Sequence, residues 1–597
     1  MILLLATLPS LAAASDHFPP LTVNLTYALY TGIRTPLTSP NLTLTTWKGI
    51  RYAAPPVGPL RWQRPQLPAA PPPNTTPPAS VLANTPGPTC PQAMPAIPGL
   101  GFVRGEEDCL FLNVWAASTS SSPSPSPEVG TEVNGTGTGG KGSPVLVVIH
   151  GGGYGLGGAG TDMTSFLVGG GEGMVVVETQ YRLGAFGFLA SPEVKRRGVL
   201  NAGLLDQKLA LEWVQEHIAQ FGGDPERVTI MGESAGGGSV MLHAMAEGGG
   251  LGTRLFTNII AASPWVPTQP RYDDAISVRH YDDFAALAGC KGQGDVFGCL
   301  VGRDSLTLQY AANQVSTSPP TPRGNWAFIP VTDDEYVLGP PSVQLAKGKL
   351  NGLRLLVGNN ANEGTLIPPS NILTEADLIA WIKSNFANLS PQNVTALLAT
   401  YPSDSGPVRS SAPRFETSGY GPATAVNTSQ AATGQQQRCY NMYAESSVVC
   451  PAYWLATSFS HNHLPAHHYQ YSVPFASHGA DLAATFGPPG PNLGPDLVTA
   501  FQKIYTNFIT TNSPSLSAHD ANGASSPRPE APHPASKWPA WPGFVNINQT
   551  GGEAYKVYFR GKGLRNAITV VGDAEAWEGG RGERCEVWKG LGGVVPL

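Results

Sequence analysis

A serine within a tight glycine turn is the strongest chemical signal in the sequence. Residues 232–236, Gly-Glu-Ser-Ala-Gly, match the pattern G-x-S-x-G. Apolar residues 228–231 predict a short buried strand before the turn, and a helix is expected to start at Ala235. A nucleophilic Ser234 would project from such a turn, where only glycine leaves room on both sides. An ordinary glycine-rich turn is the alternative, so the interpretation depends on finding partners for the serine.

His478 is the candidate general base that a serine nucleophile requires. It follows a predicted strand at residues 468–473, on a loop beyond the strand's carboxyl end. In this type of site the chain order is serine, then acid, then histidine, which His478 satisfies. The other histidines considered are expected before that strand, at the opposite end of the sheet, or in a polar loop: His461, His463, His467, His468, His519 and His533.

Glu363 is the candidate acid, because it lies between Ser234 and His478 and follows a predicted strand at residues 353–358. Its carboxylate would fix the imidazole tautomer and stabilise the imidazolium. A solvated surface glutamate is the alternative. Competing acids follow a weaker predicted strand at residues 326–330: Asp333, Asp334 and Glu335.

An oxyanion produced by attack on an ester would need backbone N–H donors. Ala235, directly after the serine, would supply one of them. Residues 150–154, His-Gly-Gly-Gly-Tyr, follow a buried strand predicted at residues 144–150 and would supply the others. A plain glycine-rich turn is again the alternative.

Strand and helix patterns alternate along the chain, which predicts an α/β protein with a mostly parallel sheet. Residues 205–220 have apolar positions at helical spacing, and residues 21–26 and 42–47 alternate like the strands of a hairpin. Residues 116–143 are rich in Ser, Pro, Gly and Thr and predict a disordered surface insertion. We expect residues 15–597 to form a single domain.

Several features indicate secretion. Residues 1–14 are apolar and end in small residues, as in a signal peptide, and no later stretch is apolar and long enough to span a membrane. The net charge of −6 gives no basic surface for nucleic acid. Eight sequons predict glycosylation: Asn24, Asn41, Asn74, Asn134, Asn388, Asn393, Asn427 and Asn548.

With these motifs in order, the chain from about residue 20 to about residue 590 resembles the type-B carboxylesterase/lipase family, which includes the cholinesterases. The resemblance implies an α/β-hydrolase fold, a Ser234–Glu363–His478 triad, and oxyanion donors at Gly152, Gly153 and Ala235. Besides the serine turn, the matching segments are residues 107–113 (EDCLFLN), 181–189 (YRLGAFGFL), 201–207 (NAGLLDQ) and 221–225 (FGGDP).

The resemblance also implies a disulfide pattern and leaves Cys439 unpaired. The implied pairs are Cys90 with Cys109, Cys290 with Cys299, and Cys450 with Cys585.

One departure from the family concerns the substrate. The segment between Cys90 and Cys109 has no tryptophan, so a cation–π site for choline is not supported. Leu100, Phe102 and Trp265 would line an apolar entrance, or else pack on the surface.

We therefore expect a secreted serine ester hydrolase that forms an acyl-enzyme and acts on a small-molecule or lipid ester. No metal or organic cofactor is needed for this chemistry. A lipase or an acyltransferase with the same triad is one alternative. A non-catalytic adhesion or binding protein on the same fold is another. The natural ester and the oligomeric state stay open.

Overall fold

The computed structural model describes residues 20–37, 42–70, 80–97, 99–119, 142–170, 173–401, 432–473, 476–490, 492–550 and 563–597. The expected signal peptide, residues 1–14, lies outside them, as do Asn41, Asn74, Asn134 and Asn427. The predicted bounds of the insertion, residues 116–143, are too wide. Its first four residues end one strand, Ser143 begins another, and residues 120–141 lie outside the description.

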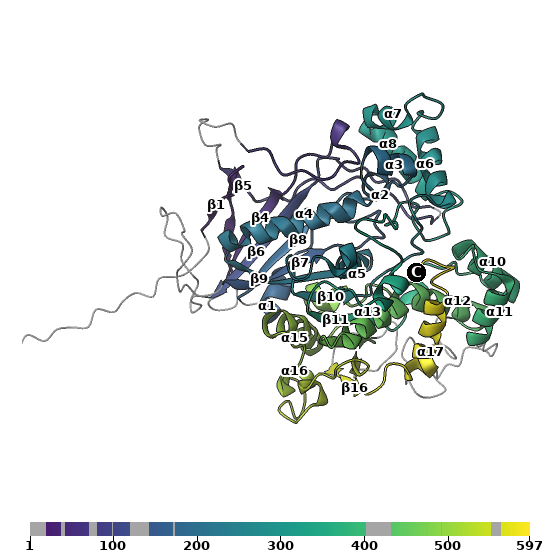
Figure 1. Ribbon diagram of the computed structural model, residues 1–597. Coiled ribbons are helices and arrows are strands. Elements are labelled where there is room, and N and C mark those ends of the chain that lie inside the picture. The colour runs from purple at the N-terminus through teal and green to yellow at the C-terminus, as the bar shows by residue number, and fades with distance from the viewer. Residues whose placement is uncertain are drawn as a thin grey trace, which may run out of the picture.

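An 11-stranded, mostly parallel sheet organises the molecule (Figure 1). The seven neighbouring strands β13, β12, β11, β10, β9, β7 and β8 run parallel. The strand beyond β13 and the three strands beyond β8 pair antiparallel. The predicted fold class is thus confirmed. In spatial order the strands are β16 (Thr569–Val571), β13 (Phe544–Ile547), β12 (Ala466–Tyr471), β11 (Arg354–Asn360), β10 (Asn258–Ala262), β9 (Gly223–Glu233), β7 (Ser143–Ile149), β8 (Val175–Thr179), β6 (Phe111–Thr119), β4 (Leu42–Arg51) and β3 (Ile33–Pro36).

Helices cover both faces of the sheet, so the central strands are buried on both sides. Strand β7 illustrates this: Val145, Val147 and Ile149 pack into one hydrophobic cluster, and Leu146 and Val148 into another. The first cluster includes helices α4 (Ala202–His217), α5 (Ala235–Met245) and α13 (Cys450–His461). The second includes α1 (Thr164–Gly170), α14 (Leu482–Phe486) and α15 (Pro495–Thr511).

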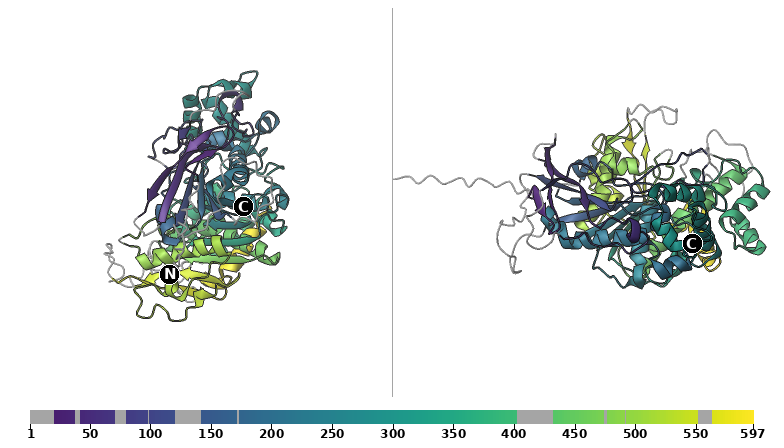
Figure 2. Two further views of the ribbon diagram at one scale, coloured as in Figure 1. Left: turned by 90° about the vertical axis from the view of Figure 1, so that its left-hand side faces the viewer. Right: turned by 90° about the horizontal axis from the view of Figure 1, so that it is seen from above.

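The remaining helices lie around this layered core. Helices α10 and α11 lie at the end of the molecule opposite β1 (Figures 1 and 2). The bounds are α2 (Gly184–Phe188), α3 (Pro192–Arg197), α6 (Ala275–Leu287), α7 (Val296–Gly302), α8 (Ser305–Ser316), α9 (Pro341–Ala346), α10 (Glu375–Asn385), α11 (Pro391–Thr400), α12 (Gly434–Ala444), α16 (Ala518–Asn522) and α17 (Trp577–Gly590).

The hairpin predicted from residues 21–26 and 42–47 is wrong. Strand β1 (Thr22–Asn24) instead pairs with β2 (Leu29–Thr31), which also pairs with β5 (Val81–Leu82) in a separate small sheet. Strand β4 pairs with β3 and β6 in the main sheet. The reason is local: a tight turn, in which the N–H of Leu25 donates to the carbonyl oxygen of Ala28, joins β1 directly to β2. A second small sheet joins β14 (Gln549–Thr550) to β15 (Arg565–Asn566).

Three disulfides are present, and they are the three that the family resemblance implied: Cys90–Cys109, Cys290–Cys299 and Cys450–Cys585. Cys439 is unpaired and buried. In the described part of the chain, no helix combines the length and apolar character that crossing a bilayer requires.

Candidate active site

The predicted strand–turn–helix around Ser234 is present. Strand β9 ends at Glu233, helix α5 begins at Ala235, and Ser234 between them has φ +59° and ψ −125°. A Cβ on Gly232 would lie 2.2 Å from the backbone of Gly236, and one on Gly236 would lie 2.1 Å from the carbonyl oxygen of Ile149. Both flanking glycines are therefore required by close backbone approach, as the motif predicted.

Ser234, His478 and Glu363 meet at the carboxyl ends of three parallel strands. The Oγ of Ser234 lies 2.7 Å from Nε2 of His478. The Nδ1 of the same ring lies 2.5 Å from Oε2 of Glu363. Glu363 follows β11, His478 follows β12, and Ser234 follows β9. Because a general base must lie within hydrogen-bonding distance of its nucleophile, this geometry suits proton transfer from the serine.

Two further residues hold Glu363 in place, and neither was predicted from the sequence. Ser263, directly after β10, donates from Oγ to Oε1 of Glu363 over 2.7 Å. The backbone N–H of Asn360, the last residue of β11, donates to the same oxygen over 2.5 Å. Their only sequence signal is their position at the ends of neighbouring parallel strands, where side chains converge.

Three acidic side chains surround the imidazole of His478. Burial disfavours its charged form, but the nearby Glu363, Glu233 and Asp481 outweigh burial and raise the pKa of His478 to about 9. Glu233 lies with Oε1 3.6 Å from Nε2 of His478. Burial raises the pKa of Glu233 to about 8, despite the opposing effect of His478. The cluster therefore stabilises the imidazolium that forms when His478 takes a proton.

The glycine loop predicted to form an oxyanion hole lies directly against the serine turn. A Cβ on Gly151 would be 2.6 Å from the carbonyl oxygen of Glu233. Gly152 and Gly153 have φ of +105° and +63°, and a Cβ on Gly153 would be 2.2 Å from the ring of Trp326. Within the described part of the chain, the N–H groups of Gly152, Gly153 and Ala235 donate to no protein acceptor.

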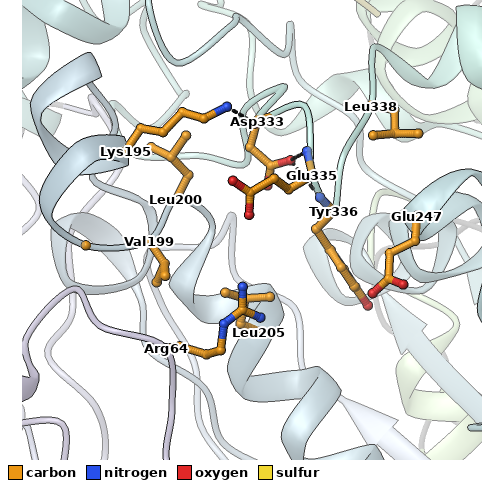
Figure 3. A pocket seen from close by; sticks show the side chains of 11 residues that line it. Arg64, Lys195, Val199, Leu200, Leu205, Glu247, Asp333, Glu335, Tyr336 and Leu338 are labelled. Carbon is orange, nitrogen blue, oxygen red and sulfur yellow. Dashed lines mark hydrogen bonds between the residues drawn. The ribbon is translucent and has the colours of Figure 1, made fainter.

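The competing acids lie elsewhere, and residues 326–330 are not a strand. The carboxylate of Asp333 accepts hydrogen bonds from the backbone N–H groups of residues 335–337 and from Asn201, so it stabilises a turn. Asp334 pairs with Arg271. Asp333 and Glu335 line a separate polar cavity of about 490 Å³, shown in Figure 3, whose lining includes no member of the Ser234 cluster.

The expectation that His467 and His468 precede the strand is wrong, because β12 begins at Ala466 and contains both. The ring of His468 packs edge-on against Tyr453, Trp541 and Phe544, and burial lowers its pKa to about 3. The others stand apart from Ser234: His519 pairs with Glu530, His533 caps a short helix, and His461 and His463 end α13 and the turn after it.

An apolar cavity of about 520 Å³ has Trp326, whose ring lies against Gly153, among its lining residues, but its lining includes neither the glycine loop nor a triad residue. Trp326 lies in its wall and packs edge-on against Trp265, with ring centroids 5.5 Å apart. The backbone N–H of Trp265 in turn donates to the carbonyl oxygen of Ser234 over 2.9 Å. The other residues that line the cavity include Phe188, Ile276, Phe328, Phe386 and Val595.

The three residues considered for an apolar entrance behave differently from one another. Trp265 is fully buried and donates from its indole to Tyr443, so it forms an internal wall. Phe102 stacks on Tyr310 with centroids 4.3 Å apart, and Leu100 is 43% exposed. Phe102 and Leu100 therefore pack on the surface.

Comparison with known proteins identifies a family and a similar fold. A family model described as the carboxylesterase family matches residues 19–557. The chain belongs to this family. Its fold resembles Aspergillus niger EstA, with a TM-score of 0.74 and 26% identity over 98% of this chain and 100% of that one. The protein thus has the α/β-hydrolase fold of this family.

Curated relatives are fungal lipases and carboxylesterases. Lipase 5 of Diutina rugosa is 34% identical, but the match spans only 44% of this chain and 50% of that protein. Secreted lipase 1 of Botryotinia fuckeliana (strain B05.10) is 32% identical over 61% and 64%. Carboxylesterase patB of Aspergillus clavatus is 29% identical over 71% and 70%. The alignments thus span about half to 70% of these relatives.

Proposed function

We propose that the protein is a secreted serine carboxylic ester hydrolase that works through an acyl-enzyme on Ser234. The observation that carries this proposal is the continuous contact from Ser234 Oγ to His478 to the buried Glu363. A serine hydroxyl is a weak nucleophile until a base removes its proton, and the neutral imidazole of His478 is placed to do so.

In the first step, Ser234 Oγ attacks the ester carbonyl carbon while His478 Nε2 accepts the hydroxyl proton. Glu363 orients the ring and stabilises the imidazolium. The N–H groups of Gly152, Gly153 and Ala235 stabilise the negative oxygen of the tetrahedral intermediate.

The intermediate then collapses. The bond to the alcohol breaks, and His478 returns the proton to the leaving oxygen. Water, activated by the same histidine, attacks the acyl-enzyme by the reverse sequence, releasing the acid and restoring Ser234.

A lipase is the second candidate, because Trp326, whose ring lies against Gly153 of the glycine loop, also lines an apolar cavity. A volume of about 520 Å³ lined by aromatic and aliphatic side chains is typical of a site for an apolar ligand. An acyltransferase would use the same triad and differ only in the acceptor. A binding-only role is disfavoured because every member of the triad is present.

Secretion and glycosylation rest on separate support. Three disulfides are typical of an oxidising compartment, and two relatives are named secreted lipases. The asparagines of two described sequons, Asn24 and Asn388, are exposed, whereas Asn393 and Asn548 are half-buried. Amino-terminal sequencing of protein from the culture medium, with and without glycosidase treatment, tests cleavage after Ala14 and the attached glycans.

The esterase proposal is tested by the hydrolysis of p-nitrophenyl acetate, butyrate and palmitate by the wild type and by Ser234→Ala. We expect turnover by the wild type alone, and the chain-length profile then separates esterase from lipase. Equal activity in the variant would exclude Ser234 as the nucleophile. Inactive, folded wild type would favour the binding role.

A further inference from the structure

Asn360 contacts both of the carboxylates that lie behind His478. Its backbone N–H donates to Glu363, and its side-chain Nδ2 donates to Oδ1 of Asp481 and to Oγ of Ser263, each over 3.1 Å. The residue is fully buried at the end of β11. Asn360 thus donates a hydrogen bond to Glu363 and another to Asp481.

The amide of Asn360 is not explained by stability alone. Its Oδ1 is buried and has no hydrogen-bond partner in the described part of the chain. Burying an unpaired acceptor costs free energy, a cost that leucine, of similar shape, would avoid. What leucine would lose at this position is the pair of hydrogen bonds that Nδ2 donates to Ser263 and Asp481.

Asp481 is three residues after His478 and is 1% exposed. Burial raises its pKa, whereas the hydrogen bonds from Asn360 and from Tyr469 oppose that rise. The hydroxyl of Tyr469 lies 2.9 Å from Oδ2 of Asp481 and 2.7 Å from the hydroxyl of Tyr505. The ionisation of Asp481 consequently depends on a few donors, and the amide of Asn360 is one of them.

The charged groups around His478 come from three elements. Glu233 ends β9, Glu363 follows β11, and Asp481 lies in the turn that carries His478 itself. Tyrosines of β12 and α15 face Asp481, and burial raises their pKa values, so they stay neutral: Tyr469, Tyr471 and Tyr505. In the described part of the chain, no lysine or arginine forms an ion pair with the three carboxylates.

We propose that Asn360 is a positioning residue for ester hydrolysis: its side-chain amide holds Asp481 as a carboxylate behind His478, while its backbone N–H fixes Glu363. The negative charge of Asp481 then helps the imidazole to accept the proton of Ser234. This inference rests on the proposed function of the Ser234–His478 pair.

The test is the pH profile of kcat for the variant Asn360→Leu, which keeps the branched shape of the side chain and the backbone N–H but removes the amide. Without that donor Asp481 becomes protonated more readily, so His478 loses a neighbouring charge and its pKa falls. We expect the acidic limb to move to lower pH by about half a unit or more.

Two further variants make the test specific. Asp481→Asn removes the charge itself, so it should shift the limb in the same direction, and the double variant should shift it no further than Asp481→Asn alone. Asn359→Leu is the matched control, because Asn359 is equally buried on β11 but donates only to the backbone oxygen of Asn360. It should leave the limb in place even if it lowers stability.

An unmoved limb in Asn360→Leu, or an additive shift in the double variant, would overturn the proposal. If Asn360→Leu does not fold, an acidic limb that does not move in Asp481→Asn would overturn the proposal instead. If the wild type shows no Ser234-dependent turnover, the proposed function fails separately. The inference about Asn360 is then decided by the titration of His478, followed by NMR of histidine-labelled protein and assigned with His478→Gln.

Discussion

Glu363 is a buried carboxylate that accepts hydrogen bonds, and in the described part of the chain it forms no ion pair with an arginine or lysine. It is 1% exposed, and the His478 ring, the Ser263 hydroxyl and the Asn360 backbone N–H contact its two oxygens. A buried charge is tolerated when donors satisfy it in this way. The sequence predicted the acid from its place after a strand, whereas the only sequence signal of Ser263 is its own place at a strand end, because its contact with Glu363 depends on the packing of β10 beside β11.

Glu363→Gln should lower kcat by about 10⁴-fold and leave KM nearly unchanged, because the amide would favour the wrong imidazole tautomer. Steady-state hydrolysis of a p-nitrophenyl ester measures the loss. Glu335→Gln, in the separate polar cavity, is the control and should keep full activity. A loss below tenfold for Glu363→Gln would remove Glu363 from the triad.

The reaction should be slow in acid and accelerate as the pH rises toward about 9. The neighbouring carboxylates raise the pKa of His478 to about 9, and only the neutral imidazole accepts the serine proton, so activity is lost as the pH falls through that pKa. A kcat profile between pH 5 and 10 checks this. A limb at or below the ordinary histidine pKa of about 6.5 would contradict the account.

At the scale of elements, the turn between β9 and α5 was predictable because glycine spacing and the flanking apolar strand are local signals. The pairing of β1 with β2 was not, because the same alternating pattern fits several partners. The two-residue error at the start of β12 had a larger effect, since it moved His467 and His468 into the sheet. Strand existence was thus easier to predict than strand pairing or boundaries.

Gly236→Ala should destabilise the protein by about 1 to 3 kcal/mol or prevent folding, because the added methyl would lie 2.1 Å from the carbonyl oxygen of Ile149. Thermal unfolding measures the effect. Gly302→Ala is a matched control at the end of α7, where a Cβ would meet nothing within 4 Å. Equal melting temperatures for the two variants would show that the turn is looser than described.

At the scale of the whole molecule, one sheet joins segments from residue 33 to residue 571, which supports the proposal that residues 15–597 form a single domain. The family resemblance predicted this architecture and the disulfide pairs. The two cavities and the Asn360–Asp481 contact were not predictable, because each is built by residues that only the packing of distant strands and helices brings together.

The Cys450–Cys585 disulfide should stabilise the molecule more than Cys290–Cys299. The former links residues 135 apart in sequence and the latter residues 9 apart. The loop-entropy relation gives contributions of about 5 kcal/mol and about 2.6 kcal/mol, respectively. Urea denaturation of the two Cys→Ser double variants compares them. A larger loss from the short loop would show that loop entropy does not govern the stabilisation.

The most direct test of the central claim is covalent trapping of the nucleophile. Treatment with an excess of diethyl p-nitrophenyl phosphate, followed by peptide mass spectrometry, should place one diethylphosphoryl group on Ser234 and abolish ester hydrolysis in parallel. His478→Gln should react far more slowly, because the serine would lack its base. Modification of another residue, with activity lost at the same rate and Ser234 unlabelled, would contradict the mechanism.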